Sequence, residues 1–252
     1  PELKVYLTSV TEEWSVATLS GPNAGKILKA AGVDISLDPA DFPFMTMREA
    51  HIAGLPVRIF RISFTGELSY EINIQARHGL ALWTHLMKAG AEFGITPYGT
   101  EAMHVLRAEK GFIIVGQETD GSVTPQDLGM DWIVSKVKPD YIGKRALERA
   151  SMAADNRKQL VGLRTKERKQ VIPEGAHAVL DPNQPMPMDM LGQVTSSYYS
   201  PNVGSSIAMA MLKGGRALMG GTVYLPMLDG SVIEAEVVEP IFYDPKGERL
   251  NG

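Results

Sequence analysis

Two carboxylates stand four residues apart in the stretch RISFTGELSYEINI, at Glu67 and Glu71. Apolar and polar residues alternate from Leu68 to Ile74, which predicts a β-strand with one buried face and one polar face. Glutamate is disfavoured in strands, so its recurrence on the polar face needs an explanation. Either this face is solvated in an antiparallel sheet, or a carboxylate on it binds a ligand that carries paired N–H donors. The residues alone leave both interpretations open.

The elements around the two glutamates predict a hairpin accompanied by helices. Residues 55–64 alternate as a first arm, and Thr65-Gly66 supplies the turn because glycine adopts the positive φ of a tight reversal. Apolar periodicity and flanking glycines predict the helices. The expected helices span residues 22–31, 79–93 and 100–110, and further strands are expected at residues 4–10 and 14–19.

The second half of the sequence changes to short apolar stretches separated by turn signals. Six such stretches between residues 159 and 239 predict a small all-β barrel or sandwich. Residues 111–138 lack periodicity, but their interleaved apolar residues indicate an ordered loop. We therefore expect an α+β protein with one domain over residues 1–150 and a second over residues 151–252, divided near a polar segment.

Composition excludes several classes of protein. A net charge of −4 and a pI near 5.8 argue against a nucleic-acid surface. The absence of cysteine excludes disulfides, thiolate catalysis and zinc–sulfur sites, and it fits a reducing cytoplasm. No apolar run is long enough to span a bilayer, so no membrane partner is expected. The abrupt start at Pro1, without leader features, indicates a piece of a longer polypeptide.

Other candidate motifs fail on their spacing. GPNAGK is one residue too short for a phosphate-binding loop and is followed by Ile27 instead of Ser or Thr, so helix capping explains it better. The five histidines show no metal-ligand spacing. Arg107 and Glu109 on a predicted helix are compatible with ordinary ion pairs. A basic cluster of Lys136, Lys138, Lys144 and Arg145 is left without an assigned role.

Five segments carry a resemblance that the isolated motifs do not. They are the hairpin, TEAMHVLRAEKG, TPQDLGMDW, YIGKRAL and GQVTSSYYSPNVGSSIAMAML, which occur in this order and cover nearly the whole chain. Together they resemble the glycine-cleavage T-protein family of folate-dependent aminomethyltransferases. The sequence is similar in particular to one branch of that family, the C-terminal region of the α subunit of heterotetrameric sarcosine oxidase.

The resemblance implies both a fold and an activity. It implies a T-protein-like folate-binding domain, truncated at its N-terminus, followed by a small C-terminal β-barrel. It also implies tetrahydrofolate as the cofactor, which accepts the imine from sarcosine oxidation and gives 5,10-methylenetetrahydrofolate and glycine. FAD, FMN and NAD are expected only elsewhere in such a complex, and the flavin-bearing β subunit is an expected partner.

The resemblance further implies four cofactor-binding residues. Glu71 occupies the last position of the TGExxxE hairpin, where the family carries its pterin-binding carboxylate, while Glu67 is expected to be structural. Phe64 stands where relatives place an aromatic residue next to the folate, and Tyr70 directly precedes the carboxylate. Arg107 matches a family arginine for which a binding role and a structural role both stay open.

Two departures from the family pattern refine these expectations. Met103 stands where typical members carry a folate-contacting arginine, so the glutamate tail of the folate would be held differently. The family's catalytic aspartate would lie before Pro1, so we expect no catalytic residue here and an inactive chain by itself. Two alternatives stay open: a non-catalytic assembly module that docks the flavin-bearing β subunit, and a free-standing aminomethyltransferase that acts on a lipoyl-carrier substrate.

Overall fold

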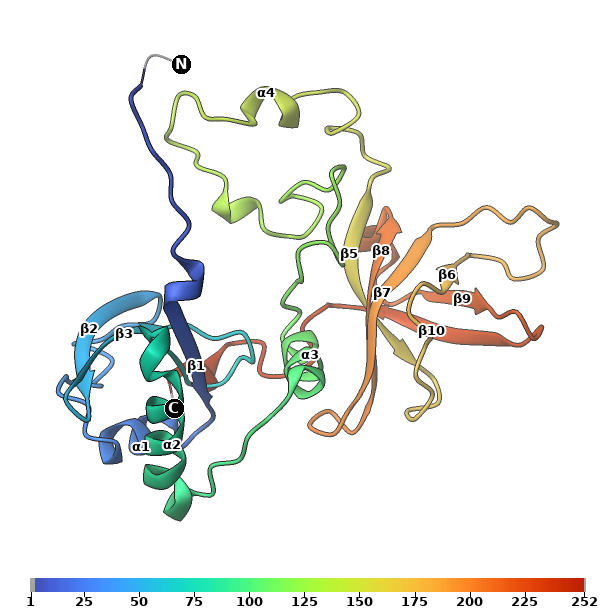
Figure 1. Ribbon diagram of the computed structural model, residues 1–252. Helices are drawn as coiled ribbons and strands as arrows, with labels where there is room; N and C mark the ends of the chain where they lie inside the picture. The colour runs from blue at the N-terminus through green and yellow to red at the C-terminus, as the bar shows by residue number, and fades with distance from the viewer. Residues whose placement is uncertain (1–2, 252) are drawn as a thin grey trace. The chain divides into compact units, whose positions relative to one another are not determined.

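The computed structural model describes residues 3–251 and divides into two compact units (Figure 1). The first unit contains the chain up to Met103 together with the segment from Lys246 onward, and the second contains His104–Pro245. The compact units therefore separate inside a helix and not near residue 150. The cause is that the loop before residue 150 packs with the strands after it, as when the Leu160 N–H donates to the Asp127 carbonyl at 2.8 Å.

A four-stranded antiparallel sheet organises the first unit. Its order is β1-β4-β3-β2, so that β4 is an inner strand and β1 is an edge strand. The strands are β1 (Trp14–Ser20), β2 (Thr46–Ile52), β3 (Leu55–Arg61) and β4 (Ser69–Gln75).

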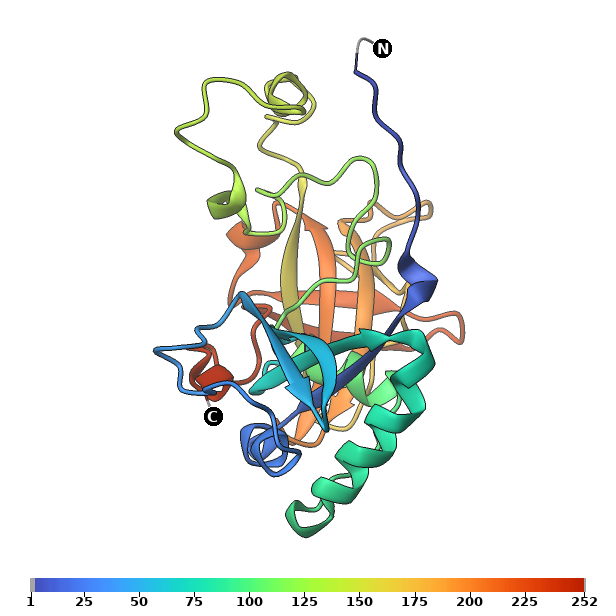
Figure 2. The same cartoon turned by 60° about the vertical axis from the view of Figure 1, so that its left-hand side comes forward.

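Two helices cover one face of this sheet, α1 (Ala24–Ala30) and α2 (Gly79–Ala89) (Figure 2). Leu28 of α1 and Leu86 of α2 pack with Ile59 and Ile72 of the sheet in a single apolar core. The side chains on the opposite face of the sheet therefore point away from the helices.

The predicted alternation in β4 is confirmed, because Leu68, Tyr70, Ile72 and Ile74 are all buried. The hairpin itself differs from the prediction. The first arm ends at Arg61, and residues 62–68 form a loop that contains Gly66 at φ 82°. The tight two-residue turn joins β2 to β3 instead, and β2 had no counterpart in the prediction.

The expected strand at residues 4–10 is wrong. These residues form no strand, and the side chains of Tyr6 and Leu7 are each 94% exposed. Their alternation suits a strand, but a strand also needs a hydrogen-bonding neighbour, and none of the described residues provides one. The strand expected at 14–19 is confirmed as β1.

The three predicted helices are confirmed with shifted ends. α2 stops at Ala89 and continues as a 3₁₀ turn, Ala91–Phe93, before Gly94 at φ 71°. α3 spans Thr100–Glu109, and Gly111 follows it at φ 67°. The expected irregular loop after α3 contains only the 3₁₀ turn Asp131–Ile133, and α4 (Lys144–Leu147) follows. Further 3₁₀ turns lie at Thr11–Glu13, Ala76–His78, Gly215–Leu218 and Glu248–Asn251.

The six predicted strands of the second half are confirmed, and they form a barrel. All neighbours pair antiparallel in the order β6-β7-β8-β5-β10-β9. Reciprocal hydrogen bonds between Val179 and Tyr224, at 2.8 and 3.0 Å, join the two ends of the sheet. The strands are β5 (Lys158–Thr165), β6 (His177–Ala178), β7 (Gly192–Ser200), β8 (Ser205–Lys213), β9 (Thr222–Pro226) and β10 (Val232–Val238).

Neither unit offers a helix suited to a bilayer. Throughout residues 3–251, every helix is too short or too polar to cross a membrane.

Candidate functional site

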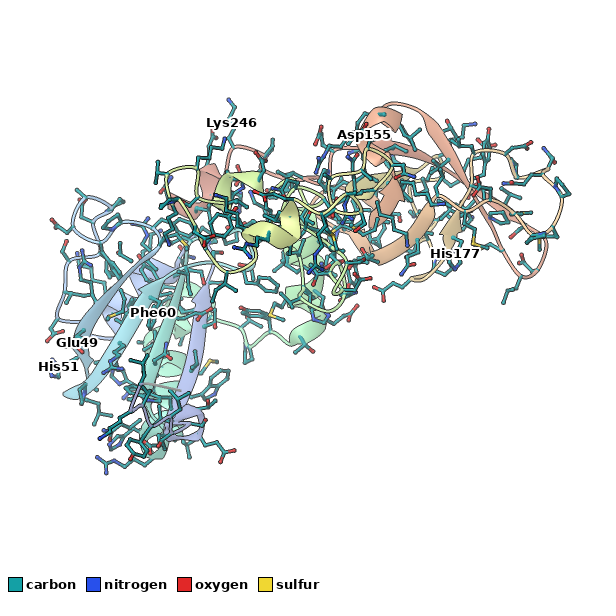
Figure 3. All side chains as sticks on the ribbon, turned by 90° about the horizontal axis from the view of Figure 1, so that it is seen from above. Glu49, His51, Phe60, Asp155, His177 and Lys246 are labelled. Atoms are coloured by element: carbon teal, nitrogen blue, oxygen red, sulfur yellow. The ribbon has the colours of Figure 1, made fainter. Side chains whose placement is uncertain are left out.

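The face of the first unit's sheet that is not covered by helices carries the candidate site. Strand register aligns one row of side chains across it: Thr18 of β1, Glu71 of β4, Phe60 of β3 and Met47 of β2. Figure 3 shows Phe60 on β3, with Glu49 and His51 on the neighbouring β2. This open face combines apolar, aromatic and charged groups, as a binding surface does.

Glu71 is the candidate binding group at the centre of this row. Its side chain is partly buried, and within residues 3–251 its carboxylate has no hydrogen bond and no ion pair. Burial raises the pKa of Glu71 above its ordinary value of 4.5. Because β4 is bonded to a strand on each side, the carboxylate is held on rigid backbone. Such a group can accept two parallel N–H donors from a ligand.

Glu67 differs from Glu71 in having a partner. Its Oε1 accepts a hydrogen bond from Nε of Arg249, and its side chain is 17% exposed. Arg249 belongs to the returning C-terminal segment of the same unit. Glu67 thus ties that segment to the loop before β4, which agrees with its expected structural role.

Phe64 and Tyr70 occupy different environments from Glu71. Phe64 lies partly buried in the loop between β3 and β4. Tyr70 is 1% exposed, and its ring centroid lies 6.1 Å from that of Phe42. Burial raises the pKa of Tyr70, while the nearby charge of Arg61 opposes the rise. Adjacent strand residues point to opposite faces, so Tyr70 belongs to the core and fixes the position of β4.

Arg107 belongs to the second unit and is fully buried there. Its guanidinium donates to the Glu118 carboxylate at 3.1 Å, to Ser196 Oγ at 2.6 Å and to the Phe112 carbonyl at 3.1 Å. Since these partners occupy its terminal nitrogens, the geometry favours the structural role over the binding role. The expected set of four residues is therefore divided between the two units.

Sequence reasoning missed the network around Arg107. Glu118 also accepts from Ser196 Oγ and from the Ile114 N–H. Glu109 accepts from Ser200 Oγ at 2.6 Å and from Asn202 at 2.9 Å. The sequence holds one signal of this network, the charged residues Arg107 and Glu109 near the end of α3, but their partners lie up to 93 positions away.

A cavity of about 500 Å³ lies along the edge of β1 in the first unit. β1, the start of α1, α2 and residues 93–100 line it, together with Met103. Thr18 lines the cavity and is also the register partner of Glu71, which itself does not line it. Nowhere in residues 3–251 do three or more histidine or acidic side chains gather in a way that could hold a metal ion.

Comparison with known families assigns this architecture. The family model for the GCVT N-terminal domain matches residues 1–138, and the model for the glycine cleavage T-protein C-terminal barrel domain matches residues 158–244. The chain belongs to the glycine cleavage T-protein family. The resemblance read from the five segments is thus confirmed. The boundary expected at residue 150 falls between the two matched ranges, and as a domain boundary it stays a prediction.

Relatives of this chain include both oxidoreductases and transferases. The sarcosine oxidase subunit alpha of Corynebacterium sp. (strain P-1) is 44% identical over 259 residues, covering 100% of this chain but 26% of that protein. The chain therefore spans about a quarter of the length of that relative. The aminomethyltransferase of Halothermothrix orenii is 31% identical and covers 94% of this chain and 63% of its own length.

The fold also has a solved counterpart. The crystal structure of glycine cleavage system aminomethyltransferase T from Bartonella henselae superposes with a TM-score of 0.76 at 25% identity. The match covers 91% of this chain and 60% of that one. This supports the expected fold class, an α+β T-protein-like domain followed by a barrel.

Proposed function

We propose that this chain is the tetrahydrofolate-binding part of a sarcosine oxidase α subunit. In the complete enzyme, the imine from sarcosine oxidation is transferred to tetrahydrofolate, which gives 5,10-methylenetetrahydrofolate and glycine. FAD, FMN and NAD bind elsewhere in the complex, and the lack of cysteine suits a cytoplasmic enzyme. Similarity to sarcosine oxidase subunit alpha over the whole chain supports this proposal.

The partly buried carboxylate of Glu71, unpaired within residues 3–251, is the observation that carries the proposal. A pterin ring presents its N3–H and its 2-amino group side by side, and an ionised carboxylate can accept a hydrogen bond from each. The carboxylate is partly desolvated and has no partner of its own in the described part of the chain. Paired donors from a ligand would replace the lost hydration of the carboxylate, and such bonds are stronger away from water.

The remaining residues of the chain would orient the folate and not react with it. Bound tetrahydrofolate supplies the amine that takes up the one-carbon unit. Phe60 lies next to Glu71 in the same row and offers a ring on which a planar ligand can pack. We propose that this chain binds and positions folate without catalysing the transfer alone.

Replacing Glu71 with Gln tests the proposal. Gln keeps the size of the side chain but replaces one acceptor oxygen with a donor and removes the charge. We expect tetrahydrofolate binding to weaken by roughly 1.5–3 kcal/mol, measured by calorimetry on the full-length protein. Glu67→Gln is the matched control, because its carboxylate already pairs with Arg249. Equal affinity in Glu71→Gln and the natural protein would contradict the assignment.

A second function, docking of a partner subunit, is favoured by a separate observation. In the second unit, Trp132, Val137 and Ile142 are 74%, 92% and 105% exposed. Exposed lysines, Lys136 and Lys138, lie among them. Apolar side chains rimmed by charge are typical of protein interfaces. Loss of the flavin-bearing β subunit from a Trp132→Ser variant that still binds folate would support docking by this segment.

A further inference from the structure

Arg58 shares the open sheet face with Glu71. It lies on β3 opposite Asn73, one position along the face from the pair formed by Phe60 and Glu71. Its guanidinium carbon lies 4.7 Å from the ring centroid of Trp14, at the start of β1. The guanidinium is therefore stacked on an aromatic ring, which limits its orientations without occupying its N–H groups.

The donors of Arg58 are unused by the described residues. Nε of Arg58 lies 3.6 Å from a carboxylate oxygen of Glu49, which is an ion contact beyond hydrogen-bond range. The two side chains are 49% and 74% exposed, so this contact is weak and easily exchanged. No hydrogen bond from the Arg58 guanidinium is found within residues 3–251. A planar fork of N–H donors is thus presented to the open face.

Strand register gives the separation between the Arg58 guanidinium and the Glu71 carboxylate. Trp14 pairs with Gln75, which lies four residues along β4 from Glu71. At about 3.3 Å per residue, the guanidinium on Trp14 is roughly 13 Å along the sheet from the row of Glu71. The p-aminobenzoyl group and glutamate of a folate are long enough to bridge such a distance.

We propose that Arg58, oriented by Trp14, binds the carboxylates of the folate's glutamate tail. This inference rests on the proposed function, in which Glu71 binds the pterin. A carboxylate and a guanidinium form the geometry-matched, bidentate pair that an aromatic platform preorganises. The site would replace the arginine that this chain lacks at Met103.

Two ligands distinguish binding of the glutamate tail from binding of the pterin ring. Tetrahydrofolate carries both parts, whereas 6-methyltetrahydropterin lacks the benzoylglutamate tail. Calorimetry on the full-length protein would compare both ligands for the natural protein, Arg58→Gln and Lys88→Gln. Lys88 is an exposed residue of α2, on the helical side of the sheet, and its variant controls for the loss of one positive charge.

We expect Arg58→Gln to lower the affinity for tetrahydrofolate about tenfold and to leave the affinity for 6-methyltetrahydropterin unchanged. Trp14→Leu should cause a smaller loss in the same direction, because the guanidinium keeps its charge but loses its platform. Lys88→Gln should match the natural protein with both ligands. Thermal unfolding of each variant would show that the fold is intact.

The outcomes distinguish this inference from the function on which it rests. Unchanged tetrahydrofolate affinity in Arg58→Gln, or an equal loss for both ligands, would overturn the tail site while leaving pterin binding in place. Failure of the natural protein to bind either ligand would contradict the proposed function and the tail site together.

Discussion

The two units of this chain treat their charged groups differently. In the second unit, Arg107 and Glu118 are fully buried and bonded to each other and to Ser196. On the open sheet face of the first unit, Glu71 and Arg58 have no hydrogen bond from the described residues. Buried groups bonded to each other hold a fold together, whereas accessible groups on rigid strands that lack such bonds are available to a ligand.

Burial alone does not make this distinction. Arg61 is 1% exposed in the first unit and donates to the Phe42 carbonyl at 2.7 Å, and its Nε, like that of Arg107, has no partner among the described residues. It lies in the core beside Tyr70, away from the open face. A charged group therefore suggests binding only when an unsatisfied donor or acceptor is also accessible.

The largest expected effect comes from breaking the network of the second unit. Arg107→Met leaves the carboxylate of Glu118 buried without its cation, and removing one partner of a buried pair costs about 3–5 kcal/mol. Denaturant unfolding should show this loss in the free energy of unfolding. The double variant Arg107→Met with Glu118→Gln should recover part of the loss. A single variant as stable as the natural protein would show that the network is not structural.

A smaller effect, with a definite sign, is expected from Glu71 as pH changes. Burial raises the pKa of Glu71, so the folded protein holds this proton more tightly than the unfolded chain does. This contribution to stability is present below the ordinary pKa of 4.5 and is lost as pH rises through the raised value. Folate binding should change in the opposite direction, since the paired N–H donors require the ionised carboxylate.

Glu71→Gln provides the comparison for this pH dependence. The variant cannot titrate at this position, so its stability and its folate affinity should both depend less on pH than those of the natural protein. Unfolding midpoints and folate affinities measured from pH 4 to pH 7 would test the two signs separately, with about half-unit steps resolving the transition. A natural protein whose folate affinity increases as the pH is lowered through this range would contradict the role of Glu71.

The same contrast explains what could be predicted from the sequence. Alternation located β4 because its apolar residues repeat every second position over a buried face. The six barrel strands were located as short apolar stretches between turn signals, and β8 among them is buried on both faces. β2 escaped notice because TMREAHI places charged residues on both faces. The Arg107 network joins residues 11 and 89 positions apart, and spacing carries no information about such contacts.

The candidate site was only partly predictable for a related reason. Glu71 was identified by the resemblance of its hairpin, and strand alternation separated it from Tyr70 on the other face. Arg58 looked like any exposed strand residue, because its importance depends on Trp14, which lies on a strand that pairs with β4 and not with β3. Residue type predicts chemistry, but the partners that leave a group free are set by tertiary structure.

The smallest expected effect concerns a close ion pair that is exposed to solvent. Nζ of Lys166 lies 2.6 Å from a carboxylate oxygen of Glu234 on the barrel, closer than the 3.1 Å between Arg107 and Glu118. If the distance between the charges alone decided how much an ion pair stabilises the fold, Lys166→Ala would destabilise the protein more than Arg107→Met. However, the side chains of Lys166 and Glu234 are 81% and 41% exposed, so water solvates both charged groups and the ion pair contributes little.

The measurement for this pair is the denaturant midpoint at low and at high salt. We expect Lys166→Ala to match the natural protein in both, since salt screens exposed charges that already contribute little. Glu234→Gln should behave in the same way and serves as the partner control. A loss in Lys166→Ala comparable to that of Arg107→Met would mean that proximity, and not burial with satisfied hydrogen bonds, decides which charges stabilise the second unit.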